Sequence, residues 1–415
     1  MRSLTNALWH AYDRDVLPER ILQFGSGMLL RALCATAVDS ANRAGASAGR
    51  IVVVPSTPEG VSRGRAVNAQ DGLFTLVERG LSGGAPMERV GLIGAIARSV
   101  DAAPDIAARP EVRVIISNAS EAGFRIDAPF PARLTDALHA RFTRAPDAPP
   151  VFVIPTELVP DNGPRLEAMV HQLARGATFR DWVKARVRFC SSLVDRIVTA
   201  PPPEQHAALE AQLGYRDALL AVAEPYALWA IEADPAELLA AFPVACASVV
   251  VAPDISFYRE RKLRLLNALH TATTPFALLA GVRIVREASR HPLLGPFQKR
   301  LLFEEIIPAT DLPADEARAF AHQVLERFAN PWLEHEYRVI ATNQEDKFRI
   351  RVAPLIVRRP TSSGFALAAA AHLTFLRAPL EALGDAAQIP EFVAATTRWM
   401  AVLAQHGVEG ALRCT

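Results

Sequence analysis

Three polar side chains, Lys262, Asn267 and His270, lie at helical spacing in the segment RERKLRLLNALHTA. On an α-helix with about 100° between successive residues, they project at roughly 0°, 140° and 80°, within less than half a turn. An amine, an amide and an imidazole on one face have the chemistry to protonate, polarise and orient a carbonyl substrate. Because unpartnered polar groups are costly to bury, this face indicates a functional site.

Lys262 is one of only four lysines among the 45 basic residues of the chain. Arginine keeps its proton in a protein, whereas burial can lower the pKa of a lysine by several units. Hydride transfer to a ketone creates an alkoxide that needs a proton donor, so we predict Lys262 as a general acid and base. The alternative is that Lys262 extends to solvent from the start of a helix while His270 is an ordinary core histidine.

The N-terminal part has the pattern of an α/β domain that can position a ligand. RILQF predicts a strand, FGSGML a turn, the next residues a helix and RIVVVPSTP a second strand, which together form a βαβ unit. RVIISNAS and PVFVIPTEL are apolar on both faces, as expected for further strands of a covered parallel sheet. YALWAIEA and CASVVVAP are two more strand-like runs after the proline cluster TAPPPEQ.

The turn after the first strand carries Gly25 and Gly27, but Leu30 occupies the position of a third small residue. The first glycine allows a tight turn, and the second lets backbone N–H groups approach a pyrophosphate at the helix N-terminus. A plain strand-to-helix turn has the same two glycines, but the position within a βαβ unit favours a dinucleotide site.

The end of the second predicted strand, VVVPST, lacks the acidic residue that usually binds the ribose 2′-hydroxyl of NAD. Arg63 and Arg65 follow, and they suit either a 2′-phosphate or a solvated loop. These residues leave the choice between NAD and NADP open. We expect NAD as the cofactor, with NADP not excluded.

From about Arg259 onward the pattern is helical, with KLRLLNALHTATTPFALLAGV, LLFEEIIPA and ADEARAFAHQVLERFAN as the clearest segments. We therefore predict an α/β dinucleotide-binding domain over residues 1–257 and an all-helical domain over residues 258–415.

Composition argues against several classes of partner and site. The formal net charge is +1, with acidic and basic residues interspersed, which does not suit nucleic acid or a membrane surface. The four cysteines lack the spacing of a zinc site or a disulfide framework, and no apolar run is long enough to cross a bilayer. We expect a cytoplasmic protein with a small-molecule ligand and no metal. The oligomeric state is open.

The segment around Lys262 resembles the K-x-x-x-x-N-x-x-H signature of the long-chain polyol dehydrogenases, the family of mannitol 2-dehydrogenase. ILQFGSGMLLRA is similar to the family's Gly-x-Gly-x-Phe-x-Arg-Ala opening. QDGLFTL, SNASEAGF, PTELVPDNG, CSSLVDRIV, PYALWAIE and RFANPWLEHEY resemble further landmarks in the same order. The resemblance implies a Rossmann-type N-terminal domain, an all-α C-terminal domain, an active site in the cleft between them and no metal requirement.

The resemblance also implies roles for individual residues. Lys262 is expected to be the general acid and base, Asn267 the polarising amide and His270 a substrate-positioning residue. Asn162, in the DNG sequence, is expected to join Asn267 at the substrate oxygen, and Asp195 to contact the substrate. The expected cofactor contacts are Gly25, Gly27, Met28, Leu29, Arg31 and Asn118. Without the resemblance, Asn162-Gly163 would be interpreted as a turn, and Asp195 beside Arg196 as a structural ion pair.

Two positions bear on the substrate. Arg259 stands where the mannitol branch has a glutamate, and a guanidinium binds a carboxylate with two parallel hydrogen bonds. Lys347 matches a basic position of the family near the substrate. YRERK and LLFEEIIP resemble the branch that interconverts keto sugar acids and hydroxy acids, such as tagaturonate and altronate. A fructuronate or polyol dehydrogenase, and a dinucleotide-binding protein without catalysis, are the alternatives.

Overall fold

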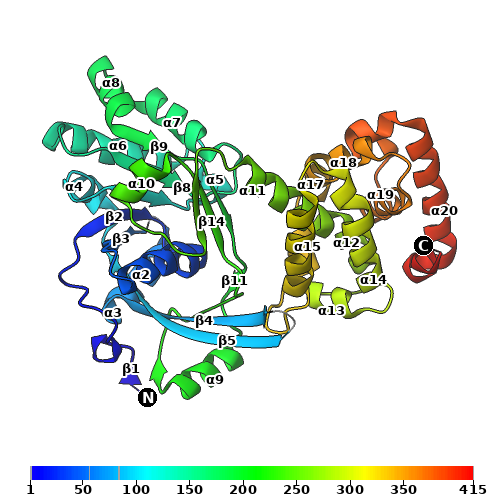
Figure 1. Cartoon of the computed structure of the whole chain (residues 1–415), viewed down its shortest axis with the longest axis horizontal. Coiled ribbons are helices and arrows are strands. Elements are labelled where there is room, and N and C mark those ends of the chain that lie inside the picture. Colours follow the sequence, from blue (N-terminus) through cyan, green and yellow to red (C-terminus); the bar gives the residue numbers. More distant parts are fainter. Residues whose placement is uncertain (1, 56, 83–84, 415) are drawn as a thin grey trace. The chain divides into compact units, whose positions relative to one another are not determined.

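The computed structural model describes residues 2–55, 57–82 and 85–414. The chain forms two compact units, one of Met1–Arg79 with Glu88–Ile255 and the other of Gly80–Met87 with Ser256–Thr415. In Figure 1 the labelled strands belong to the part of the chain coloured from blue to green, and the yellow-to-red part consists of helices.

The main sheet of the first unit has six parallel strands. In spatial order they are β6 (Ile96–Ala97), β3 (Arg50–Val54), β2 (Glu19–Phe24), β7 (Val114–Ser117), β8 (Val151–Pro155) and β9 (Val187–Phe189). This is the order of a Rossmann fold, in which the chain reverses its direction of winding after the third strand. The reversal places the switch point between β2 and β7, where such folds bind their ligands.

The strands of this sheet supply two separate cores, because successive side chains point to opposite faces. Ile51 and Val53 enter one core, while Val52 and Val54 enter the other. The second core is completed by helices, namely α4 (Ala103–Ala107), α6 (Pro129–Arg144), α7 (Asn162–Leu173) and α8 (Ala177–Arg186). The expectation of a sheet buried on both faces is therefore confirmed.

The first core is covered by a helix and by smaller sheets rather than by helices alone. The helix begins with α1 (Met28–Leu30) and ends with α2 (Thr36–Arg43). One small sheet has the order β11 (Val198–Thr199), β13 (Ala221–Ala223), β4 (Leu73–Ser82) and β5 (Ala85–Gly94). Another has the order β10 (Ser192–Asp195), β14 (Leu228–Glu232) and β15 (Val249–Ala252). YALWAIEA and CASVVVAP thus form β14 and β15, which do not join the main sheet.

The remaining elements of the first unit are short. They are β1 (Arg2–Ser3), which pairs with β12 (Tyr215–Arg216), and α3 (Pro58–Ala69), α5 (Ser120–Gly123), α9 (Pro203–Leu213) and α10 (Pro235–Ala241).

From Ser256 onward, the described chain contains helices and one isolated bridge between Ile284 and Glu336. The α-helices are α11 (Ser256–Arg261), α12 (Ala268–Leu279), α13 (Val285–Arg290), α14 (Leu294–Arg300), α15 (Ala314–Phe328), α16 (Tyr337–Ile340), α17 (Gln344–Arg351), α18 (Ala353–Arg358), α19 (Ser363–Leu376) and α20 (Pro390–Arg413). The predicted fold class, a Rossmann-type domain followed by an all-helical domain, is confirmed. Among the helices described, none is long and apolar enough to span a membrane.

In the part of the chain that the structure describes, three helices contain a π turn, a rare feature that is often found at functional sites. The π turns are Arg31–Ala35, Lys262–Asn267 and Leu301–Ile306. The periodicity of the sequence predicted regular α-helix at these segments, because one widened turn barely changes the spacing of apolar residues.

Candidate functional site

Gly25 lies at the switch point of the main sheet, directly after β2. Its N–H donates to the Val54 carbonyl oxygen at 3.3 Å, and its φ is +106°, a conformation that favours glycine. A Cβ atom on Gly25 would lie 3.0 Å from the Asn118 carbonyl oxygen. The carboxyl ends of β2, β3 and β7 therefore converge here, and a side chain on Gly25 would crowd them.

Gly27 faces open space instead. Its φ is −62°, and a Cβ atom there would have no heavy atom within 4 Å. The helix that follows begins with Met28 and Leu29, whose backbone N–H groups belong to the first turn and have no acceptor within the helix. An accessible backbone beside a helix N-terminus fits the pyrophosphate of a dinucleotide.

Arg31 shapes this glycine turn from within the protein. Its guanidinium is buried and donates to the carbonyl oxygens of Ser26 at 2.8 Å and Leu219 at 3.4 Å. Burial, with a smaller effect from Arg63, lowers the pKa of Arg31 to about 10. Arg63 itself donates to the Ser26 hydroxyl at 3.2 Å. Of the two arginines considered for a 2′-phosphate, Arg63 thus lies beside the turn, while Arg65 is exposed.

Asn118 and Asn162 fix the loops after β7 and β8. The Asn118 amide donates to the Thr156 hydroxyl at 2.9 Å. Asn162 is buried, and its amide donates to the carbonyl oxygens of Pro155, Glu157 and Ser192 and accepts from the Ser192 N–H. In this structure the Asn162 amide therefore holds the end of β8 and the loop after it against the start of β10.

Glu157 is a further organising residue, and the motif around it gave no sign of this role. Its carboxylate accepts from the Ser117 hydroxyl at 3.1 Å and from the Ala119 N–H at 2.7 Å, and burial raises its pKa. It therefore ties the end of β8 to the loop that carries Asn118.

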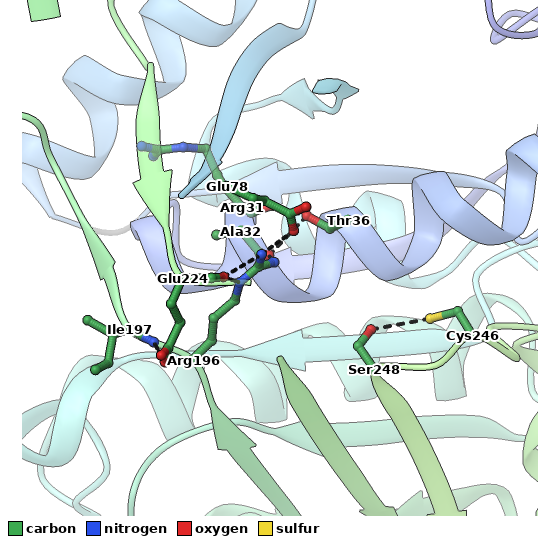
Figure 2. A network of polar contacts seen from close by, with 9 residues as sticks. All are labelled: Arg31, Ala32, Thr36, Glu78, Arg196, Ile197, Glu224, Cys246 and Ser248. Carbon is green, nitrogen blue, oxygen red and sulfur yellow. Dashed lines mark hydrogen bonds and ion pairs between the residues drawn. The ribbon is translucent and has the colours of Figure 1, made fainter. Parts of the chain in front are cut away.

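A buried network surrounds Arg196, the neighbour of Asp195 (Figure 2). The Arg196 guanidinium forms an ion pair with Glu78 and donates to the carbonyl oxygens of Ala32 and Glu224. Arg196 thus pairs with Glu78 on β4 rather than with Asp195, the partner considered from the sequence. Asp195 is buried at the end of β10.

The same network explains the π turn at Arg31–Ala35. The widened turn needs partners for its buried carbonyl groups. The Ala32 carbonyl accepts from Arg196 and, at 3.0 Å, from the Thr36 hydroxyl (Figure 2). The side chains of Thr36 and Arg196 thus supply hydrogen bonds to the π turn in the helix that follows the glycine turn.

In the second unit, Lys262 and Asn267 are the first and last residues of a π turn between α11 and α12. Hydrogen bonds in a π turn join residues five apart, as the Ala268 N–H donates to the Leu263 carbonyl. A wider turn reduces the angle between residues five apart, so Lys262 and Asn267 lie closer together around the helix than the roughly 140° expected for a regular α-helix.

His270 lies in the next turn and is 6% exposed. Its ring stacks on Phe328 with centroids 4.1 Å apart, and it meets the edge of His335 at 5.2 Å. Burial, followed by His335 and Arg327, lowers the pKa of His270 well below its usual value. The ring is therefore neutral at neutral pH.

Lys347 and Arg259 are half-buried residues of the same unit. The Lys347 ammonium donates to the Ile340 carbonyl at 2.9 Å, and its charge contributes to the lowered pKa of His270. Arg259 lies on α11, three residues before Lys262. The second unit thus gathers an ammonium, an amide, a neutral imidazole and further cations. Asn162 and Asp195 belong to the first unit.

Comparison with known proteins identifies both parts of the chain. Residues 19–239 match the mannitol dehydrogenase Rossmann domain, and residues 254–403 match the mannitol dehydrogenase C-terminal domain. The chain belongs to the mannitol dehydrogenase family. The family resemblance deduced from the sequence motifs is thereby confirmed.

Curated relatives of this mannitol dehydrogenase family member include altronate oxidoreductases. That of Klebsiella pneumoniae (strain 342) is 36% identical over 94% of this chain and 86% of its own length. That of Bacillus subtilis (strain 168) is 35% identical over 86% of this chain and 78% of its own length. The similarity to the branch that handles sugar acids is confirmed.

Two solved structures share the fold. Pseudomonas fluorescens mannitol 2-dehydrogenase, in a ternary complex with NAD and D-mannitol, is 24% identical with a TM-score of 0.76, covering 97% of this chain and 95% of its own. A substrate-free D-sorbitol dehydrogenase is 20% identical with a TM-score of 0.85, covering 99% and 100%. Among the described residues of the present chain, no three His, Cys, Asp or Glu side chains form a group that could hold a metal ion.

Proposed function

We propose that the chain is an NAD(H)-dependent oxidoreductase that interconverts a keto sugar acid and its hydroxy acid, with tagaturonate and altronate as the substrate pair. The observation that carries this proposal is that Lys262 and Asn267 begin and end a π turn, which leads directly into the helix that carries the buried His270. The 36% identity to an altronate oxidoreductase supports the choice of substrate.

A nicotinamide dinucleotide bound at the glycine turn supplies the hydride when a ketone is reduced and accepts it when an alcohol is oxidised. Gly25 and Gly27 give the backbone access that its pyrophosphate needs, and Arg31 holds the turn in shape. We propose NAD rather than NADP because the Arg63 side chain donates to Ser26 within the turn. Comparing the KM values of NADH and NADPH tests this choice.

Lys262 carries the proton. When the carbonyl carbon gains hydride, the former π pair moves to oxygen, and the Lys262 ammonium donates a proton to that oxygen. In the reverse direction the neutral amine takes the hydroxyl proton as hydride leaves. Asn267, at the other end of the π turn, donates an amide hydrogen bond to the same oxygen and stabilises its developing charge.

We propose that Arg259 and Lys347 bind the substrate carboxylate and that Asp195 contacts a substrate hydroxyl. A guanidinium and an ammonium favour a sugar acid over a neutral polyol. Asn162 takes part in the substrate site mainly by fixing the loop after β8, since its amide already has four backbone partners.

The test follows the absorbance of NADH with purified protein and tagaturonate, fructuronate or fructose. NADH oxidation by tagaturonate that is lost in Lys262→Met and kept in Lys184→Met, a variant of an exposed lysine, is the expected result. A preference for fructose would instead indicate a polyol dehydrogenase. NADH binding without oxidation by any of the three ketones would indicate a dinucleotide-binding protein without this activity.

A further inference from the structure

We infer that His335 joins His270 in a two-imidazole subsite that binds hydroxyl groups of a polyhydroxylated, anionic substrate. This inference rests on the proposed function and deepens it, because it assigns recognition of the sugar chain to a residue outside the lysine helix. His335 lies within RFANPWLEHEY, a segment to which the sequence motifs gave no catalytic or binding role.

The backbone holds His335 firmly against His270. The His335 carbonyl accepts from the Val285 N–H at 3.0 Å, and the neighbouring Glu336 forms a β-bridge with Ile284. The two imidazole rings lie 5.2 Å apart and nearly perpendicular, at 74°. Phe328 supports the other ring through its stacked contact with His270. The two rings are thus placed side by side by contacts that need no ligand.

The ring nitrogens of this pair indicate a ligand. The Nδ1 atoms of His270 and His335 are both buried, and neither has a hydrogen-bond partner among the described residues. A buried polar atom without a partner is costly, and most such atoms in folded proteins are hydrogen-bonded. Two such atoms lie in adjacent rings, one of them on His270 in the helical turn after Asn267, and a ligand that supplies the missing hydrogen bonds explains them.

The surroundings define the chemistry of that ligand. Burial is the main cause that lowers the pKa of His335 to about 4. The positive charges of Arg327 and Lys347 further lower the pKa of both His335 and His270. Each ring is therefore neutral and offers one donor and one acceptor, which matches a hydroxyl group. Arg351, anchored on the Thr271 hydroxyl at 3.3 Å, also acts on His270. Neutral imidazoles among cations suit a polyhydroxylated acid.

The alternative role for His335 is to pack against His270, and two substitutions separate the roles. His335→Phe keeps an aromatic ring for the edge contact but removes both nitrogens. His335→Asn loses the ring but keeps a polar group that can donate and accept. The subsite predicts that Phe raises the KM for tagaturonate about 10-fold, with kcat and the KM for NADH within about 3-fold of wild type, as for the loss of one or two hydrogen bonds. Asn restores most of the affinity.

His322→Asn serves as the matched control, because His322 is an exposed histidine of the same unit, on α15. Its KM values should equal those of wild type. A role in packing alone would give the reverse pattern, with wild-type KM in the Phe variant and impaired folding in the Asn variant, and would overturn the inference.

Calorimetric titration with altronate keeps this test distinct from the test of the proposed function, since binding needs no turnover. Altronate affinity that falls about 10-fold in His335→Phe supports the subsite even if the protein oxidises no NADH. If wild type turns over tagaturonate while the Phe variant keeps its KM and its altronate affinity, the proposed function stands and the subsite is wrong. Failure of wild type to bind altronate overturns the subsite as well.

Discussion

Two π turns, one in each unit, use the same backbone feature in different ways. In Arg31–Ala35 of the first unit, the Ala32 carbonyl accepts hydrogen bonds from Thr36 and Arg196. In Lys262–Asn267 of the second unit, the turn carries the proposed proton donor and the proposed polarising amide. The next turn there leads to His270, whose Nδ1 atom has no partner among the described residues.

This difference suggests how each unit binds its ligand. Around the glycine turn, the guanidinium groups of Arg31 and Arg63 donate to groups of the turn itself, and the groups proposed to bind a ligand are backbone N–H groups at a helix N-terminus. Along the lysine helix, the buried Nδ1 atoms of His270 and His335 have no partner among the described residues and are proposed to bind the ligand. We therefore expect substitutions in the first π turn network to affect stability, and substitutions along the second to affect catalysis and substrate affinity.

The largest expected effect is that of Lys262→Met. Loss of a general acid costs about 10²- to 10⁴-fold in kcat, while thermal unfolding and NADH affinity should match wild type. Stopped-flow or steady-state NADH absorbance, with differential scanning fluorimetry alongside, measures both. If Lys262→Met also lowered the unfolding temperature, Lys262 would have a structural role. The contrast between the two π turns would then disappear.

Arg196→Met should produce the opposite result, a loss of stability. The substitution leaves Glu78 without its ion-pair partner and removes the donor to two buried carbonyl groups. Breaking a buried pair costs about 3–5 kcal/mol, which a shift in the urea unfolding midpoint of the first unit would report. Arg125→Met, which breaks the exposed Arg125–Asp127 pair, is the control and should shift the midpoint far less.

Alanine substitutions at the two glycines of the turn distinguish the effect of backbone strain from the effect of blocking the approach of the ligand. Gly25→Ala forces a Cβ atom against the Asn118 carbonyl at a φ of +106°, so we expect a loss of about 1–3 kcal/mol in stability together with weaker NADH binding. Gly27→Ala meets no atom within 4 Å and should unfold like wild type. Weaker NADH binding by Gly27→Ala in fluorescence titrations is expected because the second glycine lets the backbone approach the pyrophosphate. Unchanged affinity would contradict this placement.

The smallest expected effect concerns acid stability. His372 is buried and His335 is half-buried, and burial lowers the pKa of each to about 4. Below pH 6.5 the unfolded chain takes up protons on these rings while the folded chain does not, so stability falls as the pH falls from 6.5 toward 4. Each ring contributes at most about 1.4 kcal/mol per pH unit.

His372→Leu tests this acid effect at a residue that has no role in the proposed chemistry. His372 stacks on Phe348 at 4.1 Å, and neither of its ring nitrogens has a partner among the described residues. The substitution should reduce the slope of the unfolding midpoint between pH 6.5 and 5 and leave kcat unchanged. A slope equal to that of wild type would mean that His372 does not contribute to the acid sensitivity.

The sequence by itself determined the fold class, the family and the identity of the candidate trio. Continuous apolar runs predicted β2, β3, β7 and β8, because a strand buried on both faces leaves such a pattern. Lys262, Asn267 and His270 were recognisable because their types and their spacing along one helix are local properties. The strands β14 and β15 were predicted as strands, but no local pattern says which sheet a strand will join.

The tertiary structure alone decided which polar groups have partners. Three backbone carbonyl groups and one backbone N–H bind the Asn162 amide, and two of these four groups belong to Ser192, 30 residues away. Arg196 pairs with Glu78 rather than with Asp195. The π turn over Lys262–Asn267 and the contact of His335 with His270 depend on packing between segments that the chain brings together only on folding. Such contacts leave no periodic pattern, because each depends on residues tens of positions away.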